Sequence, residues 1–145
     1  MDTNAFPLPV VRLIIKNAKD EVLILRRAGS AHATGFWCLP GGKVDYCDTV
    51  EESAVRELQE ETSLVCNSLR FLFYQDSLPP EPGGMHCINL YFACAVSGTV
   101  VLNNESSEFS WISREDIDEY EIAFRNDLAL VRYWKEKGNL PQGNS

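Results

Sequence analysis

Three glutamates in one acidic stretch have the residue type and spacing of a divalent-metal site. On an α-helix, Glu60 and Glu61 each follow Glu57 by about one turn, so that the carboxylates lie on one flank. Carboxylates this close repel one another and raise each other's pKa, a cost that a bound cation removes. Mg²⁺ takes a few carboxylates, keeps some waters and shares the phosphate oxygens of a substrate. The spacing therefore indicates a metal site that binds a phosphorylated molecule.

A glycine pair upstream of the acids strengthens this interpretation. An acidic helix face alone is more often simply exposed to solvent. Gly41 and Gly42, however, open the loop that leads into the acidic stretch, and glycine lets a backbone approach a bound phosphate closely. We therefore expect Gly41 and Gly42 to position the diphosphate of a substrate.

The acids must be held by a helix, and its ends can be read from the sequence. Thr49 followed by Glu52 is a capping box, which predicts a helix over residues 49–62. One side of this helix is apolar and would pack on a core: Val50, Ala54 and Leu58.

The stretch from Gly42 to Leu64 resembles the Nudix box, G-x5-E-x7-R-E-U-x-E-E-x-G-U with U aliphatic. The matching residues are Gly42, Arg56, Glu57, Leu58, Glu60, Glu61 and Leu64. Two positions depart from the pattern: Asp48 replaces a glutamate, and Ser63 replaces a glycine that favours the left-handed conformation at a helix end. Ser63 should cost about 1–2 kcal/mol there. The resemblance implies that the three box glutamates hold Mg²⁺ or Mn²⁺ and that Arg56 orients them.

The resemblance continues outside the box and implies further site residues. The segment from Arg26 to His32 looks like one in the MutT-type branch, where residues matching Arg27 and His32 lie near phosphate and sugar. Glu105, before Trp111, would be an additional metal ligand or general base, with Glu108 as the alternative. Asn126 would read a purine edge. For each of these residues, an ordinary surface or loop position is the competing interpretation.

The remaining pattern predicts an α/β protein with a mixed sheet between helical layers. Apolar runs at 10–15 and 21–27, separated by a polar turn, indicate a hairpin. Further strands are expected at 36–39, 64–75, 85–96 and 109–112, a short helix near 114–117, and a last helix over 123–137. The Nudix resemblance implies the same arrangement, an α/β/α sandwich with a mixed central sheet.

Composition limits the class of protein. A length of 145 residues suggests a single domain, 1–145, with loose ends at 1–8 and 138–145. The net charge of −8 argues against a nucleic-acid partner, which needs clustered Lys and Arg. The five cysteines form no CxxC pair, and several lie in apolar runs, which favours core thiols over metal ligands. With no signal peptide or membrane-length apolar run, we expect a soluble cytoplasmic protein without a membrane partner.

The Nudix resemblance, together with the acidic metal site, implies a metal-dependent pyrophosphohydrolase that cleaves a nucleoside diphosphate linked to another group. A nucleoside triphosphate, giving monophosphate and pyrophosphate, is the favoured small-molecule substrate. One box glutamate or Glu105 would accept the proton of the attacking water. ADP-ribose, another sugar nucleotide or a dinucleotide is the alternative substrate. A nucleotide-sensing module without turnover is the alternative from another class, and a homodimer is compatible with either.

Overall fold

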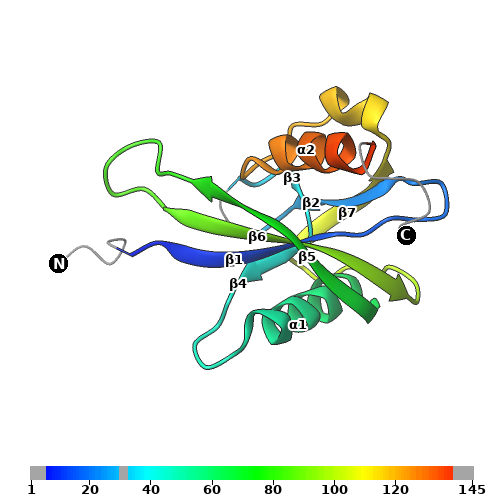
Figure 1. Ribbon diagram of the computed structural model, residues 1–145, viewed down its shortest axis with the longest axis horizontal. Coiled ribbons are helices and arrows are strands. Elements are labelled where there is room, and N and C mark those ends of the chain that lie inside the picture. Colours follow the sequence, from blue (N-terminus) through cyan, green and yellow to red (C-terminus); the bar gives the residue numbers. More distant parts are fainter. Residues whose placement is uncertain (1–5, 30–32, 139–145) are drawn as a thin grey trace.

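Three layers make up the molecule (Figure 1). The computed structural model describes residues 6–29 and 33–138. Helix α1 (Val50–Thr62) covers one side of the strands, and helix α2 (Asn126–Gly138) with the 3-10 helix η1 (Arg114–Glu119) covers the other. This is the α/β/α sandwich that the sequence predicted.

The strands form two sheets. The larger has the order β4 (Gly41–Lys43), β1 (Leu8–Ile14), β6 (Cys87–Ser97) and β5 (Val65–Ser77). The smaller has the order β3 (Trp37–Cys38), β2 (Val22–Arg27) and β7 (Ser106–Ile112). Among the described strands, β1 and β6 run parallel and the other paired strands run antiparallel, so the larger sheet is mixed.

The prediction that residues 10–15 and 21–27 form a hairpin is wrong, because these two strands are hydrogen-bonded to each other only next to the turn. Lys16 and Val22 form an antiparallel bridge, and the backbone N–H of Leu23 donates to the carbonyl oxygen of Ile15 at 3.0 Å. From there β1 enters the larger sheet and β2 the smaller. Residues 10–14 are all buried, so β1 is covered on both faces and acts as a central strand with a partner on each side.

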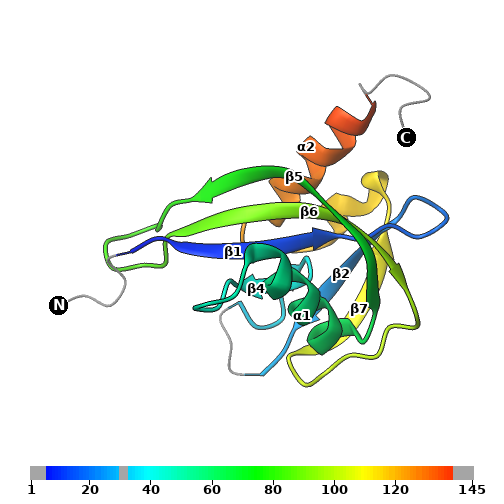
Figure 2. The same ribbon diagram turned by 60° about the horizontal axis from the view of Figure 1, so that its bottom comes forward.

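Alternate residues of β1 face the two helical layers. Val11 and Leu13 belong to the core under α1, together with Ala54 and Leu58 of that helix. Ile14 belongs to the other core, under α2. Because side chains alternate along a strand, Val10 and Arg12 lie on the α2 side with Ile14. Figure 2 shows α1 lying beside β1 and β4.

Several boundaries differ from the prediction. Helix α2 begins at Asn126 rather than at residue 123, because Phe124 and Arg125 have positive φ angles of 60° and 59°, which no α-helix contains. Leu8 and Gly138, expected in the loose ends, belong to β1 and α2. Residues 1–5 and 139–145 of those ends, and His32, lie outside the described residues.

Candidate active site

Helix α1 places the box acids, and both of its ends match the sequence prediction. The N–H of Glu52 donates to Thr49 Oγ1 at 3.0 Å, and the N–H of Thr49 donates to Glu52 Oε1 at 2.8 Å. Ser63 ends the helix with a left-handed φ of 65°, and its N–H donates to the carbonyl oxygen of Gln59 at 3.0 Å. The capping box and the left-handed end are therefore confirmed.

Gly41 anchors Glu61. Its backbone N–H donates to Glu61 Oε1 at 2.8 Å. Its φ is +152°, and a Cβ at this position would lie 1.9 Å from the carbonyl oxygen of Val11 in the neighbouring strand. Glycine is thus required for β4 to lie against β1, and the Gly41 N–H donates to a carboxylate.

Gly42 provides the space that Glu57 fills. A Cβ on residue 42 would lie 2.7 Å from both the Cδ and the Oε1 atom of Glu57. The Glu57 side chain is 17% exposed, so it is largely enclosed at this point. Any larger residue at position 42 would push the carboxylate away from β4.

The enclosed carboxylates hold protons more tightly than free ones. Burial raises the pKa of Glu57 to about 7; the charge of Glu60 adds to this rise and Arg56 opposes it. Burial also raises the pKa of Glu61 to about 8; the Gly41 N–H opposes this rise and Glu57 adds to it. The charge of Glu105 raises both pKa values, so negative charges from two parts of the chain act on the same place.

Arg56 joins the loop to the helix. Its guanidinium forms an ion pair with Asp48 and another with Asp45 at 2.8 Å. It also lies 3.7 Å from Glu60 and 3.9 Å from Glu57. Arg56 therefore holds the loop acids and faces the box acids, and the shorter side chain of Asp48 reaches it.

The two candidate acids before Trp111 lie in different surroundings. Glu108 forms an ion pair with Arg26 at 2.8 Å. Glu105 accepts a hydrogen bond from Asn103 Nδ2 at 2.9 Å and acts electrostatically on Glu57 and Glu61. Of the two, Glu105 is therefore the one that the fold brings toward the box.

Arg27 and Asn126 lie on either side of the loop before α2. The Arg27 guanidinium lies 4.8 Å from the ring centroid of Phe124. Asn126 is fully buried: its Oδ1 accepts from the N–H of Leu39 at 2.9 Å, and its Nδ2 donates to Tyr91 Oη and the Phe124 carbonyl oxygen. Asn126, which we expected to read a purine edge, is thus held inside the fold by three hydrogen bonds.

Sequence reasoning missed Arg12. This arginine is 7% exposed, donates from Nη1 to the carbonyl oxygen of Leu39 at 3.0 Å, and lies 4.9 Å from the Phe124 ring centroid. Its charge also opposes the rise in the pKa of Glu61. The sequence did contain a signal for Arg12, because it is an arginine inside a continuous apolar run. A buried strand rarely contains a cation without a specific role.

Comparison with known proteins identifies the family. A model described as the NUDIX domain matches residues 7–133. The chain belongs to the NUDIX family. Its fold matches the crystal structure of the MutT protein from Methanosarcina mazei Go1 with a TM-score of 0.81 and 28% identity, over 92% of this chain and 97% of that one.

Two curated NUDIX relatives are similar in sequence. The 8-oxo-dGTP diphosphatase of Escherichia coli is 45% identical over 51 residues, which cover 35% of this chain and 40% of the relative. The ADP-ribose pyrophosphatase of Methanocaldococcus jannaschii is 28% identical over 120 residues, covering 82% and 69%. The chain spans 30–40% of the length of the first curated relatives that it matches.

The NUDIX box acids suit a divalent ion chemically, although they do not form a ready-made cluster. Within residues 6–29 and 33–138, no three Asp, Glu, His or Cys side chains are grouped closely enough to hold an ion. Glu57 and Glu61 lie toward β4, whereas Glu60 is exposed. Hard carboxylate oxygens whose charges repel one another fit Mg²⁺ or Mn²⁺.

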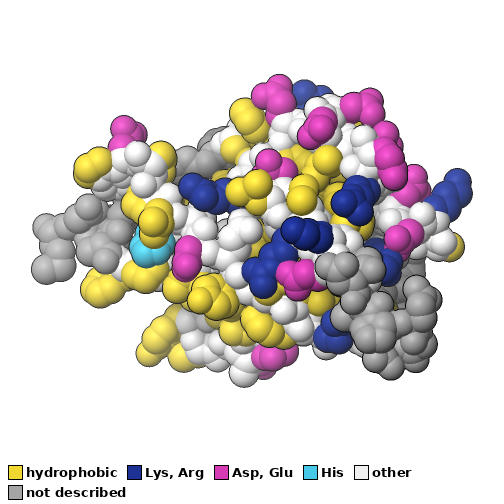
Figure 3. Space-filling model, turned by 45° about the horizontal axis from the view of Figure 1, so that its top comes forward, with side chains coloured by type: hydrophobic (Ala, Val, Ile, Leu, Met, Phe, Trp, Pro, Cys, Tyr) yellow, Lys and Arg dark blue, Asp and Glu magenta, His cyan; other side chains and the backbone are white. Residues whose placement is uncertain are grey.

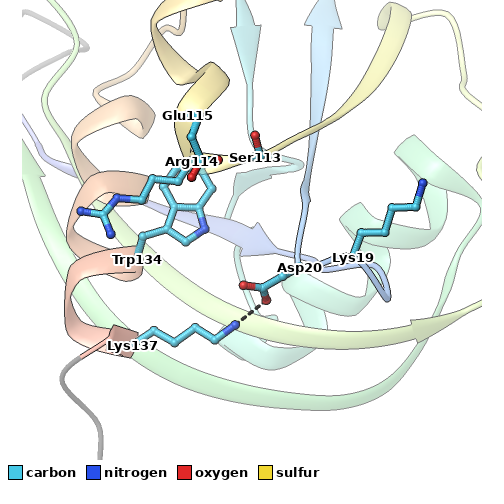
Figure 4. Close-up of a pocket in the computed structure, with 7 residues that line it drawn as sticks. All are labelled: Lys19, Asp20, Ser113, Arg114, Glu115, Trp134 and Lys137. Atoms are coloured by element: carbon cyan, nitrogen blue, oxygen red, sulfur yellow. Dashed lines mark hydrogen bonds and ion pairs between the residues drawn. The ribbon is translucent and has the colours of Figure 1, made fainter.

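Other surfaces of this NUDIX protein lie away from the box. A cavity of about 360 Å³ is lined by the turn between β1 and β2, η1 and the end of α2, and there Lys137 is paired with Asp20 (Figure 4). No box acid lines it. Acidic side chains gather over η1 in Figure 3, where the sequence reads REDIDE. No helix among the described residues is long and apolar enough to span a bilayer.

Proposed function

We propose that this NUDIX protein is a metal-dependent pyrophosphohydrolase that cleaves a nucleoside diphosphate linked to another group. The observation that carries the proposal is the pair of enclosed carboxylates, Glu57 and Glu61, each fitted to one glycine of the Gly41–Gly42 strand. Burial raises the pKa of both carboxyl groups and neighbouring acids add to the rise, and a bound divalent cation would favour their charged forms.

Each residue then has a definite task. Glu57, Glu60 and Glu61 would hold Mg²⁺ or Mn²⁺, which, when bound, neutralises phosphate charge and lowers the pKa of a coordinated water. Glu105, held by Asn103, would accept the proton of the attacking water. Arg27 would bind phosphate oxygens through its planar fork. Arg56 keeps the loop acids and the box acids in register.

Nucleoside triphosphates are the substrates that we favour, with a nucleoside monophosphate and pyrophosphate as products. The E. coli relative is named for 8-oxo-dGTP, which supports this choice. ADP-ribose is the second candidate, because the M. jannaschii relative is named for it and covers more of this chain. We place this activity in one domain, residues 1–145, and in the cytoplasm, where the free thiols of all five cysteines are stable.

Release of phosphate and pyrophosphate over a nucleotide panel tests the proposal. The panel contains canonical and oxidised triphosphates, ADP-ribose, sugar nucleotides and dinucleoside polyphosphates, each with Mg²⁺, Mn²⁺ or EDTA. We expect metal-dependent turnover that Glu57→Gln and Glu61→Gln abolish while the fold persists. Glu51→Gln, which alters an exposed acid in the first turn of the same helix, is the matched control.

Two results would contradict this function. Near-normal turnover in Glu57→Gln or Glu61→Gln would contradict the proposal that these glutamates hold the metal ion. Nucleotide binding without hydrolysis of any panel member would favour a nucleotide-sensing module instead.

A further inference from the structure

Two buried donors in the larger sheet have no hydrogen-bond partner. They are Nε of Arg12 and Nδ2 of Asn89, in side chains that are 7% and 2% exposed. In the part of the chain that the structure describes, one further buried nitrogen is unpaired, Nη2 of Arg56, and it faces Asp45 at 2.8 Å. Buried donors without partners are costly, so these two call for a ligand.

The two donors face the same side of the sheet. In the parallel pairing of β1 with β6, Arg12 lies beside Tyr91 and Val10 lies beside Asn89. Cross-strand neighbours project to the same face, and residues two apart on a strand do so as well. Arg12 and Asn89 are therefore diagonal neighbours on the α2 side.

The polar groups around these donors are already paired with one another. The carbonyl oxygen of Leu39 accepts a hydrogen bond from Arg12 Nη1, and the N–H of Leu39 donates to Asn126 Oδ1. The Asn126 amide also donates to Tyr91 Oη at 3.1 Å. Among the described residues, no carboxylate forms an ion pair with Arg12. What remains is a site with two unpaired donors, one of them on the Arg12 guanidinium, a group that has no acceptor.

The site lies next to the box acids. Arg12 is the cross-strand partner of Gly41, whose N–H holds Glu61. A nucleotide whose phosphates lie at the acids can therefore extend its base over this part of the sheet. Phe124 lies over the Arg12 guanidinium there and has a left-handed backbone, as does Arg125. Such strain in non-glycine residues is typical of segments that rearrange at a site.

We propose that Arg12 and Asn89 are specificity-determining residues that bind carbonyl oxygens on the base of the nucleotide substrate. The inference rests on the proposed function and adds base selection to it. A base with a carbonyl at this edge offers an acceptor, whereas an amino base offers a donor that would face the Arg12 guanidinium, which has no acceptor. The site therefore favours keto bases over amino bases, with the planar base taking the place of the Phe124 ring over the guanidinium.

Two matched substrate pairs test base selection directly. ITP and ATP share sugar and triphosphate and differ in a carbonyl against an amino group, as do UTP and CTP. We expect kcat/KM to favour the keto member of each pair by about tenfold, the value of a hydrogen bond to a charged donor. Arg12→Met and Asn89→Leu should each bring the ratio close to one, through a higher KM for the keto nucleotide. Arg132→Met, which removes an exposed arginine from the Phe73 ring, is the control and should leave the ratio unchanged.

The possible outcomes separate this inference from its alternatives. An equal loss of turnover for all four nucleotides would make Arg12 or Asn89 a phosphate-binding or structural residue and overturn the proposal. An unchanged ratio in both variants, or no keto preference in the wild type, would overturn it as well. Thermal unfolding verifies that each variant is folded, and Asn89→Leu retains the test if Arg12→Met does not fold.

Failure of the proposed function can be recognised separately. If the wild type hydrolyses none of the four nucleotides, calorimetric titration with IMP, AMP, UMP and CMP measures base selection without turnover. Tighter binding of IMP and UMP that disappears in both variants would support the base site. Equal binding of keto and amino nucleotides would overturn it.

Discussion

Gly42 and Glu57 are fitted to each other across the gap between β4 and α1. A Cβ on residue 42 would lie 2.7 Å from the carboxyl carbon of Glu57, closer than such atoms approach in proteins. The glycine therefore acts through the absence of a side chain, which allows a carboxylate to lie against the strand. The spacing between Gly42 and Glu57 in the box therefore has a steric cause.

Gly42→Ala should displace the Glu57 carboxylate and reduce metal-dependent turnover while the fold persists. A displacement of about 1 Å in a catalytic group can cost about a hundredfold in rate. Turnover and Mg²⁺ affinity, measured by calorimetry, check the effect. In a Glu57→Ala background the clash is removed, so adding Gly42→Ala should cost little more. A full additional loss there would show that the glycine matters for another reason.

Gly41→Ala should instead destabilise the protein, because its Cβ would meet backbone rather than a movable side chain. The contact would be 1.9 Å to the carbonyl oxygen of Val11, so β4 could not remain paired with β1. Chemical denaturation compares the two glycine variants. A Gly41→Ala protein as stable as Gly42→Ala would contradict this reading of the strand pair.

Asp48→Asn should lower turnover because it weakens the ion pair that holds Arg56. Residues that support metal ligands typically contribute about tenfold to activity. Asp48→Glu restores the residue of the box pattern, and we expect it to stay close to wild type, since the shorter acid already reaches Arg56. Steady-state kinetics measures both, with Asp118→Asn in η1 as a control. A large gain in Asp48→Glu would show that the aspartate impairs the site.

The metal-free protein should lose stability as the pH rises from about 4.5 to 8. Glu57 and Glu61 have folded pKa values of about 7 and about 8, above the ordinary glutamate value of 4.5, so the folded state binds more protons than the unfolded state in this range. Thermal midpoints in EDTA at pH 5 and pH 8.5 measure the loss, and Mg²⁺ should reduce it. The double variant Glu57→Gln, Glu61→Gln should show a flatter profile. A flat wild-type profile would mean that the carboxylates are solvated.

The two ends of α1 should respond in opposite directions. Thr49→Ala removes one half of the capping box and should lower the free energy of unfolding by about 1 kcal/mol. Ser63→Gly relieves the strain of a left-handed φ of 65° and should raise the free energy of unfolding by about 1 kcal/mol. The loss of the hydrogen bond from Ser63 Oγ to the Val101 carbonyl oxygen reduces this gain. Denaturant titration measures both. A destabilised Ser63→Gly would show that this hydrogen bond outweighs the strain.

Helix α1 was predictable because its signals are local. The cap at Thr49, the apolar side and the end at Ser63 all lie within one short segment, and the structure has each of them. The layers followed from the alternation of strands and helices. The split of the first two strands did not, because the partners of β1 come from β4 and β6, and no local pattern specifies a distant partner.

The polar residues on the α2 side of the larger sheet were harder to predict from the sequence. The burial of the Asn126 amide could not be predicted from the sequence, because nothing marks the preceding Phe124 and Arg125 as left-handed; neither is glycine. Arg12 and Asn89 are single polar residues in apolar strands. Only the parallel register of β1 and β6 brings these two residues to the same face of the sheet, and a sequence pattern does not give that register.

The parallel pairing of β1 with β6 also affects the order in which the chain can fold. Strand β1 is central in its sheet, and its parallel neighbour β6 begins only at Cys87. Long-range pairing of this kind forms slowly, because the entropy of closing the intervening chain is lost before the contacts are gained. Nascent chains that end before Cys87 therefore leave one edge of β1 open to wrong partners, and folding of the site must wait for β6.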